Sequence, residues 1–392
     1  MEVVFWISML IVFYAFLGYG ILLYLLVKLK LLFYRGSGSN GASEMFQPEV
    51  SLVIPCYNEA DIIREKAINC QNLDYDPHKL KIFFITDGST DGFREVLMEF
   101  PEITLLHEDR RAGKTAAENR AMTAIKTPFV IFSDANTLLN KDAVKNIVRH
   151  FGQPTVGCVS GEKRVYTAES DTASAAGEGI YWKYESFLKK LDSDLYSAVG
   201  AAGELVAFRS DLYEVLPEDT ILDDFMQSLL IASKGYKIVY EPDAYAMETG
   251  SATVEEELKR KIRISAGGWQ SMFRLLDKIT PFKQPVLFFQ YLSHRVLRWT
   301  VTPFLLILVF FINFALWDLG WVYQLIFVAQ IAFYAAALLG YVLENKQIRM
   351  KVLFVPYYFC VMNYAVIAGL LRFLKGGQQG AWEKAKRKEL PT

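Results

Sequence analysis

Polar and acidic side chains follow three hydrophobic segments of this sequence, at the points where we expect strands to end. The segment 50–55 (VSLVIP) is followed by CYNEAD, the segment 81–86 (KIFFIT) by DGSTDG, and the segment 128–133 (PFVIFS) by DAN. A single stretch of this kind is more often a turn or a helix cap. Because the carboxyl ends of parallel strands meet at one edge of a sheet, the three together favour a ligand site that contains carboxylates.

Two further acids, Asp223 and Asp224, stand side by side at the start of a predicted helix over 223–234. Acidic side chains stabilise the N-terminus of a helix, and this role alone would explain them. Alternatively, one of the two carboxylates points into the same cleft as Asp134 and acts as a general base. The second interpretation predicts acid–base chemistry at the edge of the sheet.

The stretch 110–119 (RRAGKTAAEN) contains Gly-Lys-Thr but is not a Walker A phosphate loop. That loop requires GxxxxGK[ST], and Glu108 stands where its first glycine would be. What remains is a basic loop that enters a helix, and Lys114 together with the helix N-terminus would suit a diphosphate. A solvent-exposed charged turn explains the stretch equally well.

Long uncharged segments indicate that part of the chain lies in a membrane. The segment 3–27 is long enough to cross a hydrocarbon core of about 30 Å as a helix, and Lys28, Lys30 and Arg35 follow it. Since basic residues favour the cytosolic side, we expect the N-terminus outside and the chain beyond residue 30 in the cytosol. A cleaved signal peptide is less consistent with a segment of this length and without a basic start.

Three more uncharged segments stand late in the sequence. The segments 299–317 and 320–343 predict a transmembrane hairpin, because only Asp318 and Leu319 separate them. The segment 352–371 either spans the membrane or lies in its cytosolic interface. The interfacial position is preferred, because it keeps the basic tail that follows on the cytosolic side.

The middle of the chain is predicted to be a soluble α/β domain. Short hydrophobic runs alternate with amphipathic helical patterns, which favours a mostly parallel sheet covered on both faces. Strands are expected at 50–55, 81–86, 103–107, 128–133, 156–161 and 237–242, and helices near 60–72, 91–99, 114–125, 140–151, 172–191 and 223–234. A net charge of -1 gives no indication of nucleic acid as a partner. Four cysteines form no CxxC pair and are expected to be reduced.

These segments predict seven parts. They are an N-terminal transmembrane anchor (1–30), a linker (31–48), a cytosolic domain (49–283), an amphipathic interfacial helix (284–299), a transmembrane hairpin (300–343), an interfacial or membrane helix (352–373) and a basic cytosolic tail (374–392). A helix that begins near Thr253 is expected to be interrupted at Gly267 and Gly268, before Trp269.

Taken together, the motifs resemble those of the processive, inverting glycosyltransferases of family 2, the group of cellulose, hyaluronan, chitin-oligosaccharide and poly-N-acetylglucosamine synthases. Seven motifs stand in the family's order: VSLVIPCYNEA, TDGSTD, RAGKTAAEN, SDAN, YWKYE, LDDF and AGGWQ. The resemblance covers nearly the whole chain. It implies an A-type glycosyltransferase domain, with a Rossmann-like, mostly parallel sheet, inserted between transmembrane and interfacial helices.

The resemblance also implies an activity. The enzyme would build a β-linked polysaccharide or oligosaccharide from a nucleotide sugar, with UDP as the expected nucleotide. It would be a multi-pass protein of the cell (inner) membrane with its catalytic domain in the cytosol. The implied partners are the nucleotide-sugar donor, a glycan or lipid acceptor and membrane lipids, and a homo-oligomer or an export partner could complete the membrane part.

Carried over residue by residue, the resemblance assigns a donor site. It implies that Tyr57, Glu59 and Asp87 hold the uridine, and that Lys114 lies near the base or the diphosphate. Asp134 and Asn136 match the family's Asp-x-Asp element, which binds the diphosphate through Mg²⁺ or Mn²⁺. Because the amide of Asn136 adds no negative charge, we expect the metal to arrive mainly with the nucleotide sugar.

The resemblance also assigns residues to the acceptor site. Asp224 matches the general base that deprotonates the acceptor hydroxyl, and Asp223 beside it is expected to contact the acceptor. Trp269 matches the aromatic residue of the QxxRW motif, and its flat ring would frame the acceptor sugar or simply pack against the membrane face. Trp382 resembles the tryptophan of a cytosolic segment after an interfacial helix.

Two departures keep alternatives open. The Gln and Arg of QxxRW are replaced by Ser265 and Gly268, and there are few membrane spans. Both are compatible with transfer of a single sugar to a polyprenyl phosphate or another lipid. A third possibility is an inactive subunit that acts as a scaffold for glycan export.

Overall fold

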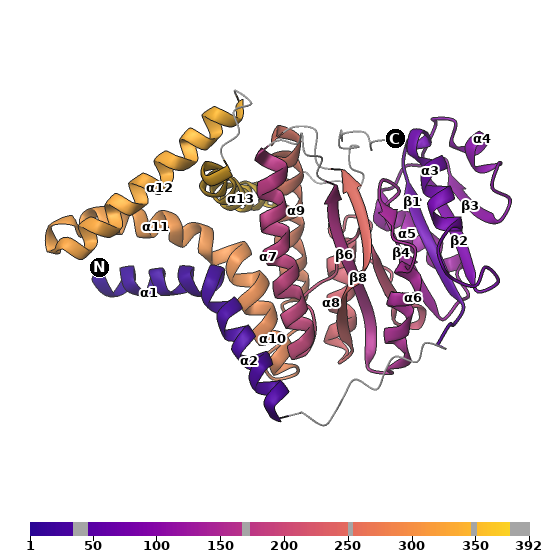
Figure 1. Cartoon of the computed structure of the whole chain (residues 1–392), viewed down its shortest axis with the longest axis horizontal. Helices are drawn as coiled ribbons and strands as arrows, with labels where there is room; N and C mark the ends of the chain where they lie inside the picture. Colours follow the sequence, from indigo (N-terminus) through magenta and orange to yellow (C-terminus); the bar gives the residue numbers. More distant parts are fainter. Residues whose placement is uncertain (34–45, 167–172, 250–253, 346–350, 377–392) are drawn as a thin grey trace.

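The computed structural model describes residues 1–33, 46–166, 173–249, 254–345 and 351–376. Its body contains one eight-stranded sheet (Figure 1). The strands are β1 (Val50–Cys56), β2 (Leu80–Asp87), β3 (Ile103–Glu108), β4 (Phe129–Phe132), β5 (Leu138–Leu139), β6 (Val156–Tyr166), β7 (Val206–Arg209) and β8 (Lys237–Thr249). Their order across the sheet is β3-β2-β1-β4-β7-β6-β8-β5.

The sheet is mixed and mostly parallel. β1 pairs in parallel with β2 and with β4, β2 with β3, and β6 with β8. The six predicted strands are all present. The two others, β5 and β7, were not predicted, and both pair antiparallel with their neighbours.

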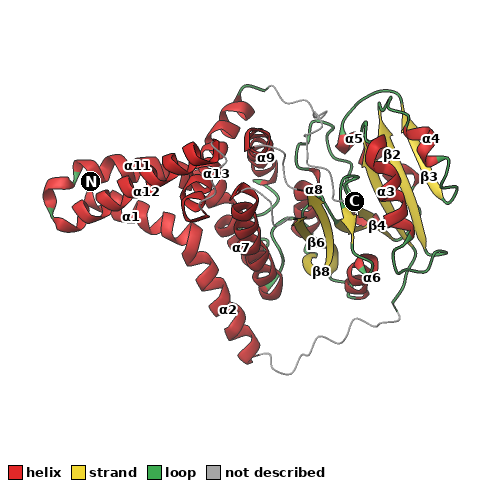
Figure 2. Ribbon diagram, turned by 45° about the horizontal axis from the view of Figure 1, so that its top comes forward, coloured by secondary structure: helices red, strands yellow, loops and turns green. Residues whose placement is uncertain are grey.

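Thirteen α-helices surround the sheet and extend away from it within the described residues (Figure 2). They are α1 (Glu2–Phe13), α2 (Tyr19–Phe33), α3 (Ala60–Gln71), α4 (Phe93–Leu97), α5 (Lys114–Ala124), α6 (Ala143–Val148), α7 (Ala173–Leu195), α8 (Asp223–Ser233), α9 (Val254–Leu275), α10 (Pro285–Tyr291), α11 (Thr302–Ala315), α12 (Trp321–Asn345) and α13 (Lys351–Leu374). π-Helical turns at Tyr14–Gly18 and Leu292–Val301 join α1 to α2 and α10 to α11.

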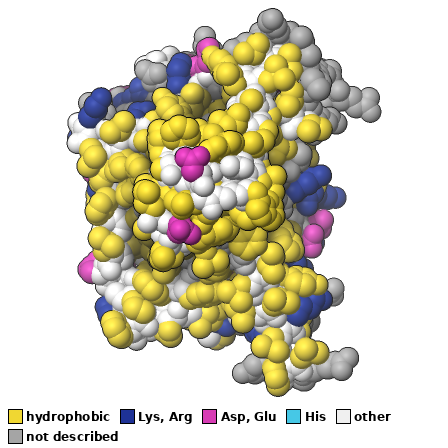
Figure 3. Space-filling model, turned by 90° about the vertical axis from the view of Figure 1, so that its left-hand side faces the viewer, with side chains coloured by type: hydrophobic (Ala, Val, Ile, Leu, Met, Phe, Trp, Pro, Cys, Tyr) yellow, Lys and Arg dark blue, Asp and Glu magenta, His cyan; other side chains and the backbone are white. Residues whose placement is uncertain are grey.

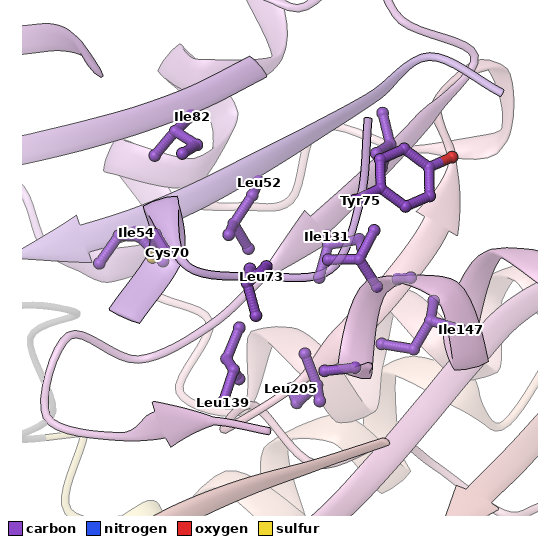
Figure 4. Close-up of a cluster of buried hydrophobic side chains, with 14 of the residues drawn as sticks. Leu52, Ile54, Cys70, Leu73, Tyr75, Ile82, Ile131, Leu139, Ile147 and Leu205 are labelled. Atoms are coloured by element: carbon purple, nitrogen blue, oxygen red, sulfur yellow. The ribbon is translucent and has the colours of Figure 1, made fainter. Parts of the chain in front are cut away.

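The two faces of the sheet carry separate hydrophobic clusters. Successive residues of a strand point to opposite faces, so Leu52 and Ile54 of β1 enter one cluster while Val53 enters the other. In the first cluster, part of which is drawn in Figure 4, the strands meet Cys70 of α3 and Ile147 of α6. In the second they meet α5, α8 and α9. Both faces are therefore buried, as a parallel sheet requires.

The helices α1, α11 and α12 form an arm that projects from the body, and α7 and α9 stand between this arm and the sheet (Figure 1). Four helical segments are long and apolar enough to cross a membrane: Glu2–Phe33, Pro285–Ala315, Trp321–Glu344 and Val352–Leu374. Seen from the arm, the surface is mainly hydrophobic, and basic side chains lie at its rims (Figure 3). The arm therefore has the surface of a membrane-embedded part.

A buried polar cluster connects α2, α10 and the π-helical turn after α10 to α7. Asp192 of α7 accepts hydrogen bonds from the Tyr19 hydroxyl of α2 and from Gln290 of α10, and its Oδ2 lies 2.6 Å from Nδ1 of His294. Glu185 of α7 forms an ion pair with Arg295 at 2.7 Å. His294 and its neighbours therefore hold helices together.

The structure also locates several predicted boundaries. Pro285–Ala315 is one continuous helix, whereas an interfacial helix over 284–299 followed by a separate span was expected. The expected interruption of α9 at Gly267 and Gly268 is wrong, because α9 runs through both. Most of the linker, 34–45, and most of the basic tail, 377–392, lie outside the described residues.

Candidate active site

Lys114 lies at the centre of a cluster of acidic side chains beyond the strand ends. Its Nζ donates a hydrogen bond to Oδ1 of Asp134 at 2.8 Å and lies 3.7 Å from Oδ2 of Asp223 and 3.8 Å from Oε1 of Glu118. Asp134 follows β4, Lys114 begins α5 and Asp223 begins α8. Segments that are far apart in the sequence therefore meet at one edge of the sheet, as predicted.

Asp224 completes the cluster. A Cβ atom built on Gly203 would lie 3.2 Å from Oδ2 of Asp224 and 3.2 Å from Nζ of Lys114. The Asp224 carboxylate and the Lys114 ammonium group therefore both lie against Gly203. Glu118, Gly203, Asp223 and Asp224 line a small cavity with room for about one water molecule.

The three carboxyl groups Glu118, Asp223 and Asp224 differ in pKa, because burial, neighbouring charges and hydrogen bonds act on each to a different extent. Burial, together with the charge of Asp223 and a hydrogen bond to it, raises the pKa of Glu118 well above its usual range. Burial also raises the pKa of Asp223, but Lys114 and the Glu118 hydrogen bond outweigh it and lower that pKa. Burial and the Asp223 charge raise the pKa of Asp224 to about 7.

Lys114 itself keeps its charge. Burial lowers its pKa, but Asp134, Asp223 and Glu118 together raise it well above the usual range. The pKa shifts therefore favour a charged Lys114, an ionised Asp223 and a neutral Glu118, and they set Asp224 to titrate near neutrality. A carboxylate with a pKa near the working pH can act as a general base.

The predicted base-binding residues lie on neighbouring loops. Asp87, at the end of β2, accepts hydrogen bonds from the backbone N–H groups of Ala112 (3.0 Å) and Gly113 (2.6 Å). The Arg111 guanidinium lies 3.8 Å from the ring centroid of Tyr57. Asp87 therefore holds the loop that leads into α5, and Tyr57 is stacked against that same loop.

The first two strand ends are also connected by turn hydrogen bonds. The backbone N–H of Ala60, at the start of α3, donates to Oδ2 of Asp91 at 2.7 Å, and the N–H of Thr90 donates to Oδ1 of Asn58 at 2.9 Å. Turn and cap roles were the alternative interpretation of these stretches, and Asp91 and Asn58 do fill them. Glu59 occupies the N-cap position of α3 without a side-chain cap hydrogen bond.

Asp134 and Asn136 could supply two of the oxygen ligands that a divalent metal needs. Both are half-buried, and the buried Ala135 stands between them in the turn that follows β4. Their oxygen atoms are the ligands that Mg²⁺ and Mn²⁺ prefer. Within the described residues, however, no group of three or more His, Cys, Asp or Glu side chains could hold a metal ion. A metal here would need further oxygen ligands from a substrate.

The residues predicted to bind the acceptor lie in different parts of the structure. Asp223 lies in the cluster, whereas Trp269 lies on α9, where its indole N–H donates to the backbone oxygen of Val366 in α13 at 3.4 Å. Trp269 is half-buried and packs against the second hydrophobic cluster. Trp382 lies outside the described residues.

The cluster includes one acid that sequence reasoning missed. Glu118 stands on α5, four residues after Lys114, and such a pair usually indicates a solvent-exposed helix face. The structure buries Glu118 against Asp223. A possible signal was the position of Glu118 in a helix that is otherwise rich in alanine.

The chain is similar to known glycosyltransferases. Residues 51–216 match the family model described as glycosyl transferase family 2. The poly-beta-1,6-N-acetyl-D-glucosamine synthase of Staphylococcus aureus (strain MSSA476) is 28% identical over 237 residues, which are 57% of this chain and 56% of that protein. The enzyme of the same name from Staphylococcus epidermidis is 27% identical over 235 residues, with the same shares. The chain thus spans about half the length of the curated relatives it matches.

One solved structure is similar over almost the whole chain. The mannosyltransferase PcManGT from Pyrobaculum calidifontis, in complex with GDP-Man and Mn²⁺, superposes with a TM-score of 0.73. The match covers 96% of this chain and 100% of that one at 24% sequence identity. At this identity the likeness shows the fold. Residues 51–216 therefore form a domain that matches glycosyl transferase family 2, and the body of the chain has the A-type fold.

Proposed function

We propose that this chain transfers a sugar from a nucleotide diphosphate donor to an acceptor hydroxyl with inversion of configuration. The observation that carries the proposal is the cluster around Lys114. It sets a cation beside Asp134, where the diphosphate would bind, and close to Asp224, a carboxyl group that titrates near neutral pH. Donor activation and acceptor deprotonation would therefore occur side by side.

In the proposed reaction, ionised Asp224 takes the proton of the acceptor hydroxyl. The hydroxyl oxygen attacks the anomeric carbon from the face opposite the nucleotide, and the bond from that carbon to the diphosphate oxygen breaks. Lys114 stabilises the negative charge on the departing diphosphate. Asp134 and Asn136 would hold Mg²⁺ or Mn²⁺, which offsets the same charge when bound.

We further propose that the product is a β-linked polysaccharide or oligosaccharide made at the cytosolic face of the cell membrane. The named relatives from Staphylococcus, which are poly-beta-1,6-N-acetyl-D-glucosamine synthases, support this product class. The four candidate spans support a membrane location. UDP is the expected nucleotide, although the similar mannosyltransferase structure contains GDP-Man and makes a GDP-sugar the first alternative donor.

The test is a donor panel. Purified full-length protein in detergent would be incubated with Mg²⁺ or Mn²⁺ and individual radiolabelled UDP- and GDP-sugars, with the Asp224→Asn variant as the matched control. Release of nucleotide diphosphate by the wild type alone supports the proposal. Folded wild-type protein that neither transfers nor hydrolyses any donor in the panel would refute it.

A second function, transfer of one sugar to a lipid acceptor, is favoured by a specific observation. Position 268, where the family motif has arginine, is a glycine whose Cβ would lie 2.4 Å from Cε3 of Trp299. An arginine cannot occupy this position without displacing the helix that carries Trp299. The length of the product decides: a ladder of products supports polymerisation, and a single lipid-linked sugar supports the second function.

A further inference from the structure

Lys66 of α3 is completely buried, which is rare for a lysine. Its Nζ donates hydrogen bonds to Oγ of Ser133 at 2.9 Å, to the backbone oxygen of Thr137 at 2.7 Å and to Oγ1 of Thr137 at 3.3 Å. All three acceptors are uncharged. Among the residues that the structure describes, Lys66 forms no ion pair.

The hydrogen bonds around Nζ of Lys66 fit an ammonium ion. The Ser133 hydroxyl donates to the backbone oxygen of Glu204 at 3.0 Å, and the Thr137 hydroxyl donates to the backbone oxygen of Asp134 at 2.9 Å. The two hydroxyl oxygens also lie 3.2 Å apart, and either could donate to the other. When each hydroxyl donates its one hydrogen to its backbone oxygen, both accept from Lys66, and three acceptors match the three N–H groups of the charged form. Burial lowers the pKa of Lys66, and electrostatic interactions with Cys70 and Asp134 oppose that effect.

The Lys66 side chain lies against the segment that contains the predicted metal and diphosphate ligands. Its acceptors, Ser133 and Thr137, enclose the segment that carries Asp134 and Asn136. The hydrogen bond from Ser133 to Glu204 also ties this segment to the loop of Gly203, which lies beside Asp224. A buried positive charge that forms no ion pair is costly in free energy, and the carboxylates of Asp134 and Glu59 offset that cost in part. The cost is accounted for if a negatively charged ligand binds on the other side of the segment.

We propose that Lys66 is a positioning residue of the donor site. Its ammonium group holds the segment 133–137 in place and supplies a fixed positive charge beneath the diphosphate of the donor. The inference rests on the proposed function, because it requires a nucleotide diphosphate at Asp134 and Asn136.

Asn69, one turn further along α3, provides a matched control. Its side chain donates to the backbone oxygen of Leu139 at 2.8 Å and accepts from the N–H of Leu139 at 2.8 Å. Asn69 therefore anchors the other end of the same polypeptide segment to the same helix, but without a charge. A purely structural role for Lys66 predicts that substitutions of Lys66 and Asn69 have similar effects.

The experiment compares ligands that differ by one phosphate. The affinities of the full-length wild type, Lys66→Met and Asn69→Leu for UDP, UMP, GDP and GMP would be measured by calorimetry with Mn²⁺ present. We expect Lys66→Met to reduce the ratio of diphosphate to monophosphate affinity about tenfold. We expect Asn69→Leu to leave that ratio unchanged. Thermal unfolding identifies the variants that are folded, and Lys66→Gln, which can still donate two hydrogen bonds, replaces Lys66→Met if that variant unfolds.

The outcomes separate the two proposals. An unchanged ratio in folded Lys66→Met or Lys66→Gln, or an equal loss in Asn69→Leu, overturns the role of Lys66 and leaves the proposed function intact. If the wild type binds none of the four nucleotides, the proposed function itself fails.

Discussion

At the scale of single residues, the two adjacent carboxylates of α8 differ in pKa. Asp223 is kept ionised by Lys114 and Glu118, and its charge helps to raise the pKa of Asp224 to about 7. The general base must be deprotonated before it can accept a proton. We therefore expect kcat/KM to fall about tenfold per pH unit below pH 7 and to level off above it.

Substitutions at both positions test this assignment. Asp224→Asn should lower kcat by about 10²- to 10⁴-fold, the usual contribution of a general base, and should leave nucleotide binding unchanged. Asp223→Asn removes a neighbouring negative charge, so the apparent pKa of the rate profile should move to lower pH. Steady-state kinetics across pH 5–9 provides the measurement. A profile that stays in place in Asp223→Asn would contradict the proposed interaction, and activity retained in Asp224→Asn would assign the base elsewhere.

Lys114 leads to a second prediction at this scale, which concerns metal binding. Its ammonium group lies 2.8 Å from Asp134, where a divalent cation would also bind. Lys114→Met should therefore bind Mn²⁺ several-fold more tightly than the wild type in the absence of nucleotide, because both a competing cation and its repulsion are removed. The same variant should bind the donor less tightly.

Titration with Mn²⁺, monitored by electron paramagnetic resonance, measures the free metal directly. Lys145→Met is a suitable control, because Lys145 also forms an ion pair with an aspartate, Asp74, but on the surface. Tight binding of Mn²⁺ to the nucleotide-free wild type through Asp134 would disprove the expectation that the metal arrives with the donor.

The residues that could be predicted are those whose sequence context is local. Asp134 ends a hydrophobic strand and Asp224 begins a helix, so their meeting at one sheet edge follows from the parallel topology. Lys66 and Glu118 stand within charged amphipathic helices, where burial cannot be distinguished from exposure by local pattern. Their contacts with Thr137 and Asp223 depend on tertiary packing.

At the scale of secondary structure elements, the glycines of α9 allow the helix to approach its neighbours closely. A Cβ on Gly267 would lie 2.7 Å from Cγ of Leu222 and 2.8 Å from Cγ2 of Ile221, the two residues that precede Asp223. The sequence suggested that these glycines end the helix. Instead, the absence of side chains lets α9 continue while it packs against the segment that leads into α8.

Gly267→Ala should disturb the start of α8. We expect a loss of about 1–3 kcal/mol in the free energy of unfolding from overpacking, together with a decrease in kcat because Asp224 moves. Nucleotide affinity should change little. Gly152→Ala is the control, because its Cβ would come no closer than 3.9 Å to Phe46. If both variants show the same kcat and the same unfolding midpoint, the close packing of α9 has no role in aligning the acids.

The strands that escaped prediction have a common physical cause. β7 has four residues and β5 has two, too few for a clear hydrophobic period. β7 inserts antiparallel between β4 and β6, and β5 pairs with β8. These pairings depend on distant segments. In contrast, β1 and β2 follow from longer hydrophobic runs, and β4 follows from four consecutive apolar residues.

At the scale of the whole molecule, α13 is in contact with both the arm and the body. A Cβ on Gly340 of α12 would lie 2.6 Å from the backbone oxygen of Leu353, and one on Gly369 would lie 2.6 Å from Cβ of Ser265 in α9. The first half of α13 therefore packs on the arm and the second half on the body. The interfacial location expected for 352–373 stays a prediction, because α13 is also long and apolar enough to span a membrane.

The interfacial location predicts that a cysteine introduced at position 392 lies on the same side of the membrane as the body. In sealed vesicles, a membrane-impermeant thiol reagent should label position 392 only when the body faces outward. A cysteine at Asp318, an exposed residue between α11 and α12, should show the opposite pattern. The variants would be made with Cys360 replaced by serine, because Cys56, Cys70 and Cys158 are buried while Cys360 is partly accessible. Labelling of positions 392 and 318 from the same side would show instead that α13 crosses the membrane, because a fourth crossing carries the end of the chain to the side of the α11–α12 turn.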